Sequence, residues 1–332
     1  MNDLRTRLQL IYNTTDITQE IQQFVESVDF TDSLDKADDL QINLTDDGRL
    51  WIRTWSPKKG ATLTCTIYQS INGIETALLC GVFHIDTVGL SGKTVSIKAT
   101  SADFNVQLRK EDRTRHWENV SLSRVLQDVA TGAGLTLDYM VQSDPVYTRI
   151  EQKRESDTAF CKRIAKAEDL MIKVYKGKLI VISASAYEQN DAIMRLSIDD
   201  ERIVARDLEY QIVDEYSTVS VKYRHPRENK VHEYTYQIPG AKADAPTLHI
   251  NRRCESPAQA ERIAKAALGQ NNRVLSNGNI TLIGSPSVMA GANIELDETW
   301  GVLAGKYSLP EVHHTIWPYV TGISLKGVYS TE

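Results

Sequence analysis

The stretch SPAQAERIAKAALG, residues 256–269, is the clearest helix signal in this chain. Ser256 and Gln259 form a capping box that satisfies backbone N–H groups at a helix start, and Pro257 stands at the first helical position. One face of the predicted helix is apolar, at Ala260, Ile263, Ala264, Ala267 and Leu268. This spacing is typical of a helix that packs against other elements of a fold.

Strand patterns precede this helix. Apolar residues alternate with polar ones at Val219, Val221 and Tyr223, and again at Tyr234, Tyr236 and Ile238. A period of two puts alternate side chains on one face, as in a half-buried strand. The last third of the chain is therefore predicted to be a β domain over 206–332 that contains one helix, at 256–269.

The first hundred residues show the same alternation. Four segments carry it, at Leu8, Leu10 and Tyr12, at Leu40, Ile42 and Leu44, at Leu63, Cys65 and Ile67, and at Val95, Ile97 and Ala99. Hairpin signals separate them at 46–48 (Asp-Asp-Gly) and 72–73 (Asn-Gly), where Gly or Asn adopts a positive φ at little cost. These patterns predict a first β domain over 1–102.

The period changes in the middle of the chain. The residues from Leu122 to Ala130 follow helical spacing behind a Ser121 N-cap, and Gly132 or Gly134 can end the helix. A second helix is predicted from Ser156, and the Lys-Gly pair at 176–177 marks a hairpin after it. The range 103–205 is therefore predicted to be an α+β domain with two helices and a hairpin, so the fold class is α+β and mostly β.

A weak internal repeat links the two β regions. A Ser-Pro pair at 56–57 precedes a strand and then Gly81, and a second Ser-Pro pair at 285–286 precedes a strand and then Gly305. The order of elements matches but the spacings differ, so a duplicated β unit and a chance likeness both stay open. Two similar units in each copy would let three copies present six such units around one axis.

Composition excludes several classes of protein. The 332 residues are 41% hydrophobic and 25% charged, which is ordinary for a globular protein and long enough for two or three domains. No apolar run of signal-peptide or membrane-spanning type is present, so we expect synthesis in a cytoplasm and no membrane insertion by this chain. A net charge of −6 disfavours tight binding of nucleic acid.

The cysteines do not form a recognisable site. Cys65, Cys80, Cys161 and Cys254 show no Cys-x-x-Cys spacing, which argues against a zinc ribbon or a redox pair. We expect them to be small buried apolar residues.

Two glycine motifs imitate nucleotide-binding loops. SGKT, residues 91–94, lacks the earlier glycine and the strand-to-helix context of a phosphate-binding loop, so a hairpin turn is favoured. Gly132-Ala133-Gly134 stands at the end of a predicted helix, not between a strand and a helix, so helix termination explains it. The G-x-S-x-G and H-E-x-x-H signatures do not occur in the sequence.

Two groups contain histidine. Glu311 and His313 would share one strand face while His314 points to the other, so a shared metal is disfavoured. His84 and Asp86 also fall at i and i+2 on a predicted strand, where a satisfied pair is the favoured interpretation.

Other charged groups do not select a site either. Spacing alone does not single out a carboxylate pair such as one within Asp199-Asp200-Glu201. The basic residues Arg252, Arg253, Arg262 and Lys265 fit an anion site, an intersubunit salt bridge or solvated surface charge. We therefore predict no catalytic residue, no cofactor site, no metal site and no enzymatic activity.

Three stretches resemble a known family. They are RESDTAFCKRIA (154–165) with LMI (170–172), RCESPAQAERIA (253–264), and a closing region from GSP (284–286) through GKYS (305–308) to His313 and His314. These resemble the phage late control gene D family, which includes tail baseplate hub proteins, and are similar to the hub part of type VI secretion spike proteins. In the first hundred residues the resemblance is carried mainly by GVFHID (81–86).

The resemblance implies a fold and a role. It implies two tube-like β-barrel domains flanking the α+β domain, in a homotrimer that forms a pseudo-sixfold ring. Such a ring adapts the symmetry of a hexameric tail tube to that of a trimeric central spike, and it lines the channel through which DNA passes in transit during genome ejection. An acidic chain suits a wall that does not hold DNA.

The implied partners follow from that role. They are further copies of the chain, the tail tube or distal tail protein, the central spike protein, other baseplate subunits and a tape measure protein. The implied location is the virion tail baseplate, after synthesis in the host bacterial cytoplasm. Because the sequence ends at Glu332 without a β-helical needle, the spike and any cell-wall hydrolase are expected to be separate chains. A baseplate-associated peptidoglycan hydrolase and a tail adaptor that forms no ring are the alternatives.

Overall fold

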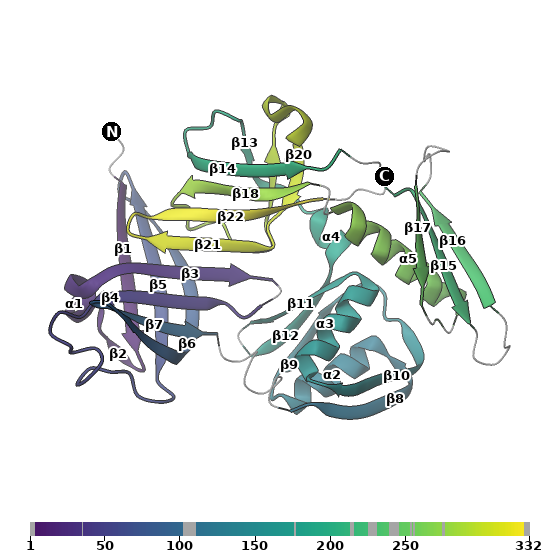
Figure 1. Cartoon of the computed structure of the whole chain (residues 1–332), viewed down its shortest axis with the longest axis horizontal. Coiled ribbons are helices and arrows are strands. Elements are labelled where there is room, and N and C mark those ends of the chain that lie inside the picture. The colour runs from purple at the N-terminus through teal and green to yellow at the C-terminus, as the bar shows by residue number, and fades with distance from the viewer. Residues whose placement is uncertain are drawn as a thin grey trace.

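The fold is seen in a computed structural model of the chain. It describes residues 4–34, 36–101, 111–175, 177–212, 216–224, 231–238, 246–252, 254, 256–273 and 276–328. Most of the described chain is β-structure, as the sequence predicts, in one large sheet and three smaller ones (Figure 1).

The large sheet has fourteen strands from both ends of the chain. The N-terminal strands are β1 (Leu4–Tyr12), β2 (Thr15–Asp16), β3 (Val25–Ser33), β4 (Asp39–Thr45), β5 (Thr62–Ile71), β6 (Ile74–Ser91) and β7 (Thr94–Thr100). The C-terminal strands are β13 (Ala192–Leu196), β14 (Ile203–Tyr210), β18 (Ser276–Ile283), β19 (Asn293–Leu296), β20 (Gly305–Ser308), β21 (Glu311–Ile316) and β22 (Val320–Gly327). Between β2 and β3 lie α1 (Thr18–Ile21) and η1 (Gln22–Phe24), and η3 (Glu298–Leu303) follows β19.

The two β regions are joined in one sheet. β21 pairs antiparallel with β3, from Glu311 opposite Ser33 to Ile316 opposite Val28. Figure 1 shows β14, β18, β22, β21 and β3 running side by side across the molecule. In the described part of the chain no strand pairing closes either region into a barrel, so the prediction of two closed tube-like β-barrels is corrected to one continuous open sheet. The two regions form one sheet because β21 pairs with β3 through the backbone, and no local sequence pattern predicts that pairing.

Both β regions have their apolar cores on the same face of this sheet. Across the junction, Phe30 lies opposite His314 and Val312 lies opposite Ile323, and all four side chains are buried. The N-terminal core is built around residues such as Phe30 and Phe83, whose rings meet edge to face at 5.9 Å. The C-terminal core holds Val312 and Ile323.

The α+β unit has its own core. Its elements are β8 (Arg113–Ser121), α2 (Leu122–Gly132), β9 (Thr136–Met140), β10 (Val146–Glu155), α3 (Asp157–Glu168), β11 (Leu170–Tyr175), β12 (Lys178–Ser183) and α4 (Ala184–Glu188). β8 pairs with β10, and β9, β12 and β11 form a second sheet, with α2 and α3 packed between. The range 103–205 assigned to this unit from the sequence also contains β13, which instead pairs with β19 in the large sheet.

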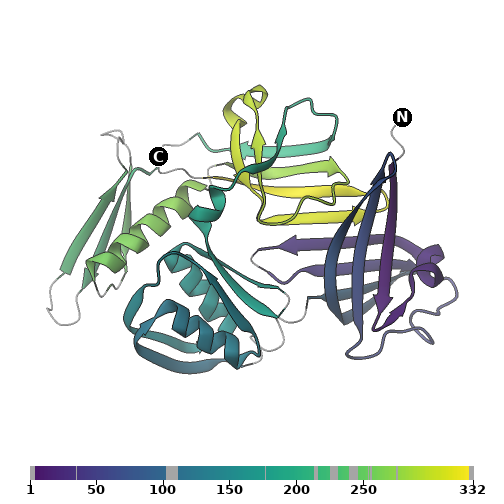
Figure 2. The same ribbon diagram turned by 180° about the vertical axis from the view of Figure 1, so that it is seen from behind.

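A fourth unit interrupts the C-terminal β region. It consists of β15 (Thr218–Arg224), β16 (Val231–Gln237), β17 (Thr247–Asn251) and α5 (Pro257–Asn272), which share a separate core. Seen from behind, this unit stands apart from the large sheet, to one side of the α+β unit (Figure 2). The alternation of these strands predicted them as part of the second β domain, because alternation reveals a strand and not its partner.

The three main helices begin where the sequence predicts. The hydroxyl groups of Ser121, Ser156 and Ser256 each accept a hydrogen bond from the backbone N–H three residues later. The predicted end of the last helix at Gly269 is wrong, because α5 continues to Asn272. No helix in the described ranges combines the length and apolarity needed to cross a bilayer.

Candidate functional site: the polar face of the continuous sheet

The face of the large sheet opposite the cores is lined by hydroxyl and amide side chains. Strand alternation places it there, since each core residue is followed by one that points to the other side. The face can be followed across β7, β4, β3, β21, β22 and β18, in that order. Its cross-strand neighbours include Ser96 with Asn43, Gln41 with Asp29, Asp29 with Thr315, Thr31 with His313, and Ser324 with Asn279. None of these side chains is fully buried. The sheet therefore presents one polar surface that spans both β regions.

Side-chain hydrogen bonds connect the strands on this face. Asn43 donates to the Ser27 hydroxyl at 2.8 Å and accepts from Ser96 at 2.6 Å. At the junction, Thr315 donates to Asp29 at 2.8 Å, and Ser324 donates to Asn279 at 3.0 Å on the C-terminal strands. Because these polar groups satisfy one another, the surface offers few unpaired donors to a passing molecule.

Acidic groups outnumber basic ones on this face. On β7, β4, β3, β21, β22, β18 and β14 it carries the carboxylates Asp29, Asp39, Asp207, Glu209 and Glu311 against the lysines Lys98 and Lys326. The hydrogen bond from His313, with Thr315 and Ser27 contributing, holds the pKa of Asp29 below its ordinary value, so that this carboxylate stays charged. A surface of this sign repels nucleic acid phosphates instead of binding them.

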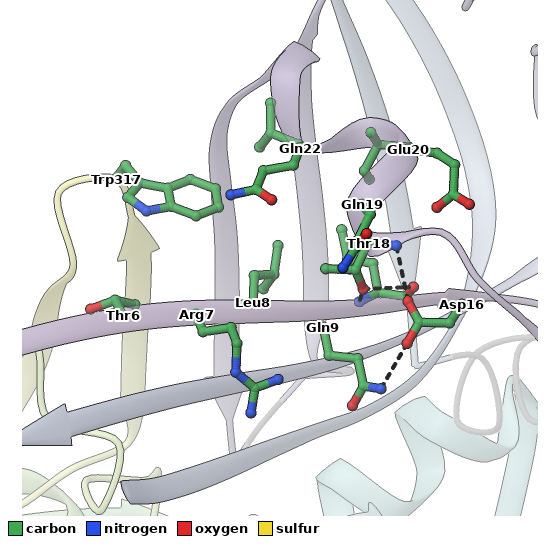
Figure 3. A pocket seen from close by; sticks show the side chains of 13 residues that line it. Thr6, Arg7, Leu8, Gln9, Asp16, Thr18, Gln19, Glu20, Gln22 and Trp317 are labelled. Carbon is green, nitrogen blue, oxygen red and sulfur yellow. Dashed lines mark hydrogen bonds between the residues drawn. The ribbon is translucent and has the colours of Figure 1, made fainter. Parts of the chain in front are cut away.

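A groove runs along the edge of β1 that faces away from β5, next to the short pairing of β1 with β2 at Ile11 and Tyr12 (Figure 3). Leu10 directs both backbone groups away from β5, because its N–H donates to Thr18 Oγ1 at 2.9 Å and its carbonyl accepts from Ile17 at 3.0 Å. By the alternation of an antiparallel ladder, the backbone groups of Thr6 and Leu8 face the same side. The groove measures about 670 Å³, and Trp317 stands at one end of it.

Asp16 anchors the wall of this groove. It accepts hydrogen bonds from the Gln9 side chain at 2.9 Å and from the Thr18 backbone N–H at 3.0 Å, as Figure 3 shows. These bonds, with Gln9 the largest cause, lower the pKa of Asp16 to about 2. The edge of β1 is thus held in an extended form suited to pairing with another strand.

A buried ion cluster ties the α+β unit to the sheet. Lys173 of β11 lies 2.5 Å from Asp32 of β3 and 3.5 Å from Asp38, and the second oxygen of Asp32 accepts from the Ala290 N–H at 2.8 Å. Burial raises the pKa of Asp38 to about 6, although the Lys173 ammonium opposes this. No local sequence pattern predicts this cluster, because residue 173 is far along the chain from residues 32 and 38.

A second buried cluster ties α5 to the α+β unit. Arg273 donates to Asp169 through two bonds of 2.7 and 3.1 Å and lies 2.6 Å from Glu188. Arg262 lies 2.7 Å from Glu168, which also accepts from the Tyr147 hydroxyl. The sequence left three interpretations open for the basic residues. At Arg262 the structure shows a different one, an ion pair within the chain.

The other members of the basic group lie in different surroundings. Lys265 pairs with Glu261 on the surface of α5 at 2.7 Å, as solvated surface charge does. Arg252 lines a surface cleft beside Glu155, and Arg253 lies outside the described residues.

The histidines at 313 and 314 fall on opposite faces, as the sequence predicts. His313 lies 3.5 Å from Asp29 on the polar face, while Glu311 pairs with Lys36 at 3.0 Å. His314 is buried between the Tyr319 hydroxyl and the Val288 carbonyl, each at 3.1 Å, and burial lowers its pKa to about 4. Within the described ranges no group of three or more His, Cys, Asp or Glu side chains is arranged to hold a metal ion.

The remaining sequence candidates occupy structural positions. SGKT forms the turn between β6 and β7, with Gly92 at φ 61° and Lys93 paired with Asp47 at 2.8 Å, which confirms a hairpin. Gly132 and Gly134 end α2 and the turn after it, which confirms helix termination.

The other residues considered from the sequence are His84 with Asp86, the carboxylates at 199–201 and the cysteines. A bulge between Ile85 and Thr87 interrupts the alternation on which a pair of His84 with Asp86 depends. Asp200 pairs with Arg202 at 2.7 Å in the turn that precedes β14. The four cysteines are buried and unbridged, as predicted.

Comparison with known proteins agrees with the sequence resemblance. No family model matches the chain. A 181-residue stretch, 53% of the chain, is 32% identical to a probable baseplate hub protein of Escherichia phage P2, of which it covers 44%. A stretch of 183 residues is 30% identical to the probable baseplate hub protein of Escherichia phage 186, covering 53% of the chain and 45% of that protein. The resemblance to phage baseplate hub proteins is confirmed.

Solved structures show the same fold at lower identity. A tail protein from Neisseria meningitidis MC58 superposes with a TM-score of 0.68 at 15% identity, over 97% of this chain and 96% of that one. The 43 kDa tail protein of prophage MuSo2 from Shewanella oneidensis gives 0.66 at 16% identity, over 97% and 98%. An Escherichia coli component of the type VI secretion system gives 0.52 at 12% identity, over 99% and 77%. The matched stretch spans less than half of the two named hub proteins, so their similarity concerns this portion of a hub protein.

Proposed function

We propose that this chain is a structural, non-enzymatic hub subunit of a phage-type tail baseplate, located in the virion tail. The observation that carries the proposal is the continuous sheet, whose two β regions share one core face and one polar, acidic face. In the proposed hub three copies form a pseudo-sixfold ring, each copy supplying two β units. The polar face lines the channel, and DNA crosses it in transit during genome ejection.

The charge and chemistry of the polar face support this role. Hydroxyl and amide groups that bond to one another, together with an excess of carboxylates, make a surface on which phosphates find little to bind. In the proposed assembly the ring contacts the tail tube or distal tail protein on one side and the central spike protein on the other. Other baseplate subunits and the tape measure protein are further proposed partners.

The three domains predicted from the sequence become, in this proposal, two tube units and a peripheral unit. The tube units are the two halves of the large sheet, and the α+β unit stands outside the ring, tied to the sheet by the cluster of Lys173 with Asp32 and Asp38. We propose that the small unit of α5 with β15, β16 and β17 belongs with this peripheral part, because Arg262 and Arg273 tie it there.

The first test is the mass of the purified chain by light scattering, over a concentration series and with the neighbouring spike protein added. A mass near three times 37.3 kDa, alone or with the spike, is expected. A chain that stays monomeric with the spike present would contradict the ring. Activity on peptidoglycan would contradict the non-enzymatic assignment.

A second test locates the channel face. Because the four native cysteines are buried, a Ser324→Cys variant carries one accessible thiol on the polar face. In the assembled ring this thiol is expected to react with a small maleimide and to resist one attached to a long polymer. A matched Lys162→Cys variant on the exposed surface of α3 should react with both, and equal reaction at both positions would contradict the assignment of the face.

A further inference from the structure

The N-terminal core opens to solvent at one end, through an apolar funnel of about 450 Å³. Deep in the funnel lie core residues of β4 and β7, namely Ile42, Leu44 and Ile97. The 46–60 loop forms its rim, and the side chains of Trp51 and Trp55 line it. Most of the lining is apolar, which sets this cavity apart from the amide-rich groove along β1.

Two tryptophan rings line the mouth of the funnel, and a phenylalanine ring packs against both. Trp51 and Trp55 meet edge to face at 5.2 Å, and Phe24 lies 5.7 Å from the first and 5.9 Å from the second. Trp55 is 45% exposed, which is unusual for so large an apolar side chain. Exposed tryptophans that border a pocket are frequent anchors of protein interfaces.

Trp51 supplies a donor without an acceptor. The residue is 7% exposed, and its buried indole N–H has no hydrogen-bond partner. A buried, unpaired N–H costs free energy, so an acceptor that reached this donor from the funnel would be bound favourably.

The rim carries a basic group in an otherwise acidic chain. Arg49, Arg53, Lys58 and Lys59 are exposed along the loop. The carboxylates nearby are engaged, because Asp46 accepts from the backbone N–H groups of Trp51 and Ile52 and Asp47 pairs with Lys93. Glu20 is the one further acid on the lining. The local charge therefore favours a partner that brings carboxylates.

The loop is preformed for binding. Its backbone is held by bonds from Trp55 N–H to the Leu50 carbonyl at 2.8 Å and from Lys58 N–H to the Tyr12 hydroxyl at 3.1 Å. A partner therefore loses little free energy in ordering it.

We propose that the funnel is a docking site for an acidic protein segment, which inserts one aromatic or large aliphatic side chain between Trp51 and Trp55. A carboxylate or carbonyl oxygen of the segment accepts from the Trp51 indole, and its acidic residues face Arg53, Lys58 and Lys59. The funnel is built by the 46–60 loop over core residues of this one chain, so the proposal does not rest on the proposed channel face or ring.

The test is selection of a displayed library of random peptides on the immobilised full chain, followed by calorimetry of the enriched peptides. Enriched sequences are expected to combine several Asp or Glu residues with one Phe, Trp, Tyr, Leu or Met. No enrichment, or a motif without acids or without an apolar residue, would overturn the proposal.

Variants then place the peptides in the funnel. Trp55→Ala is expected to weaken binding about tenfold or more. Lys58→Glu with Lys59→Glu is expected to weaken it about tenfold at low salt and less at high salt. Trp51→Phe, which keeps the ring and removes the N–H, is expected to weaken it about threefold.

A charge-reversal control and a measurement of self-association distinguish this proposal from a general charge effect and from binding of a second copy. The matched double reversal Lys162→Glu with Lys166→Glu, on the exposed side of α3, should leave binding within about twofold. Equal losses in this control would show a general charge effect and overturn the assignment. Self-association of the chain that disappears in Trp55→Ala would instead assign the funnel to a second copy. Unchanged circular dichroism and thermal midpoints establish that the variants fold.

Discussion

Phe30 and Thr31 are neighbours on β3, yet they belong to two different surfaces. Phe30 is 1% exposed and packs against Phe83 and His314 on the core face. Thr31 bonds to His313 at 2.8 Å on the polar face. The core face stabilises the sheet through apolar packing, whereas the side chains of the polar face bond mainly to one another. Substitutions on the two faces should therefore have very different consequences for stability.

The largest expected effect lies on the core face. Phe30→Ala should lower the free energy of unfolding by about 3–5 kcal/mol, because it leaves a cavity where the two halves of the sheet meet. Chemical denaturation followed by circular dichroism measures it. Thr31→Ala is the matched control and should cost less than about 1 kcal/mol. Similar losses for both would mean that the faces are not distinct.

The buried cluster that ties the α+β unit to the sheet comes next. Lys173→Ala should cost about 3 kcal/mol, because it leaves Asp32, which is 1% exposed, without its ammonium partner. Lys178→Ala removes an exposed pair with Asp138 on the neighbouring strand and should cost less than about 1 kcal/mol. Limited proteolysis should also cleave the α+β unit faster in Lys173→Ala than in the wild type. An unchanged rate of cleavage would mean that the cluster does not hold this unit against the sheet.

The third effect depends on pH. Burial lowers the pKa of His314 to about 4 in the folded state, below its ordinary 6.5. The unfolded chain therefore binds this proton first, and stability is lost as pH falls from 6.5 toward 4. His314→Gln should remove up to about 3 kcal/mol of that dependence. Urea titrations at several pH values check this, and an unchanged slope in the variant would contradict it.

Asp38 works against His314 in the same pH range. Its folded pKa is raised to about 6 from an ordinary 3.8, so its contribution to stability falls as pH rises through that window. Asp38→Asn should therefore steepen the loss of stability on acidification. A variant with the dependence of the wild type would show that Asp38 stays charged in the folded chain.

The smallest effect on stability is expected on the polar face. Gln41→Lys with Ser324→Lys should change the free energy of unfolding by less than about 1 kcal/mol, since neither side chain is buried. The added cations should instead give the chain a measurable, salt-sensitive affinity for DNA in gel-shift assays. The control is Ser324→Gln with Gln41 left in place, which adds a long polar side chain without charge, and DNA binding by that control would contradict an electrostatic cause.

Local patterns allowed much of the fold to be predicted. The Ser121, Ser156 and Ser256 caps were identified because a hydroxyl and an N–H three residues later are close in sequence. The polar face was also within reach of the sequence, in the alternation of Ser27, Asp29 and Thr31, but the strand that carries them, β3, was not among those predicted. The Lys173 cluster was beyond reach, because its three residues are far apart in the chain.

The sequence by itself determined the three main helices, several of the strands, the opposite faces of His313 and His314, and the burial of the cysteines. These depend on spacings of two to four residues, which periodicity and capping report directly. Only the tertiary structure decided that β21 pairs with β3, that β15 and its neighbours form a separate sheet with α5, and that Trp51 keeps an unpaired N–H beside a basic rim. The physical reason is that backbone pairing and desolvation act between segments distant in sequence, and a strand's pattern is the same whichever partner it finds.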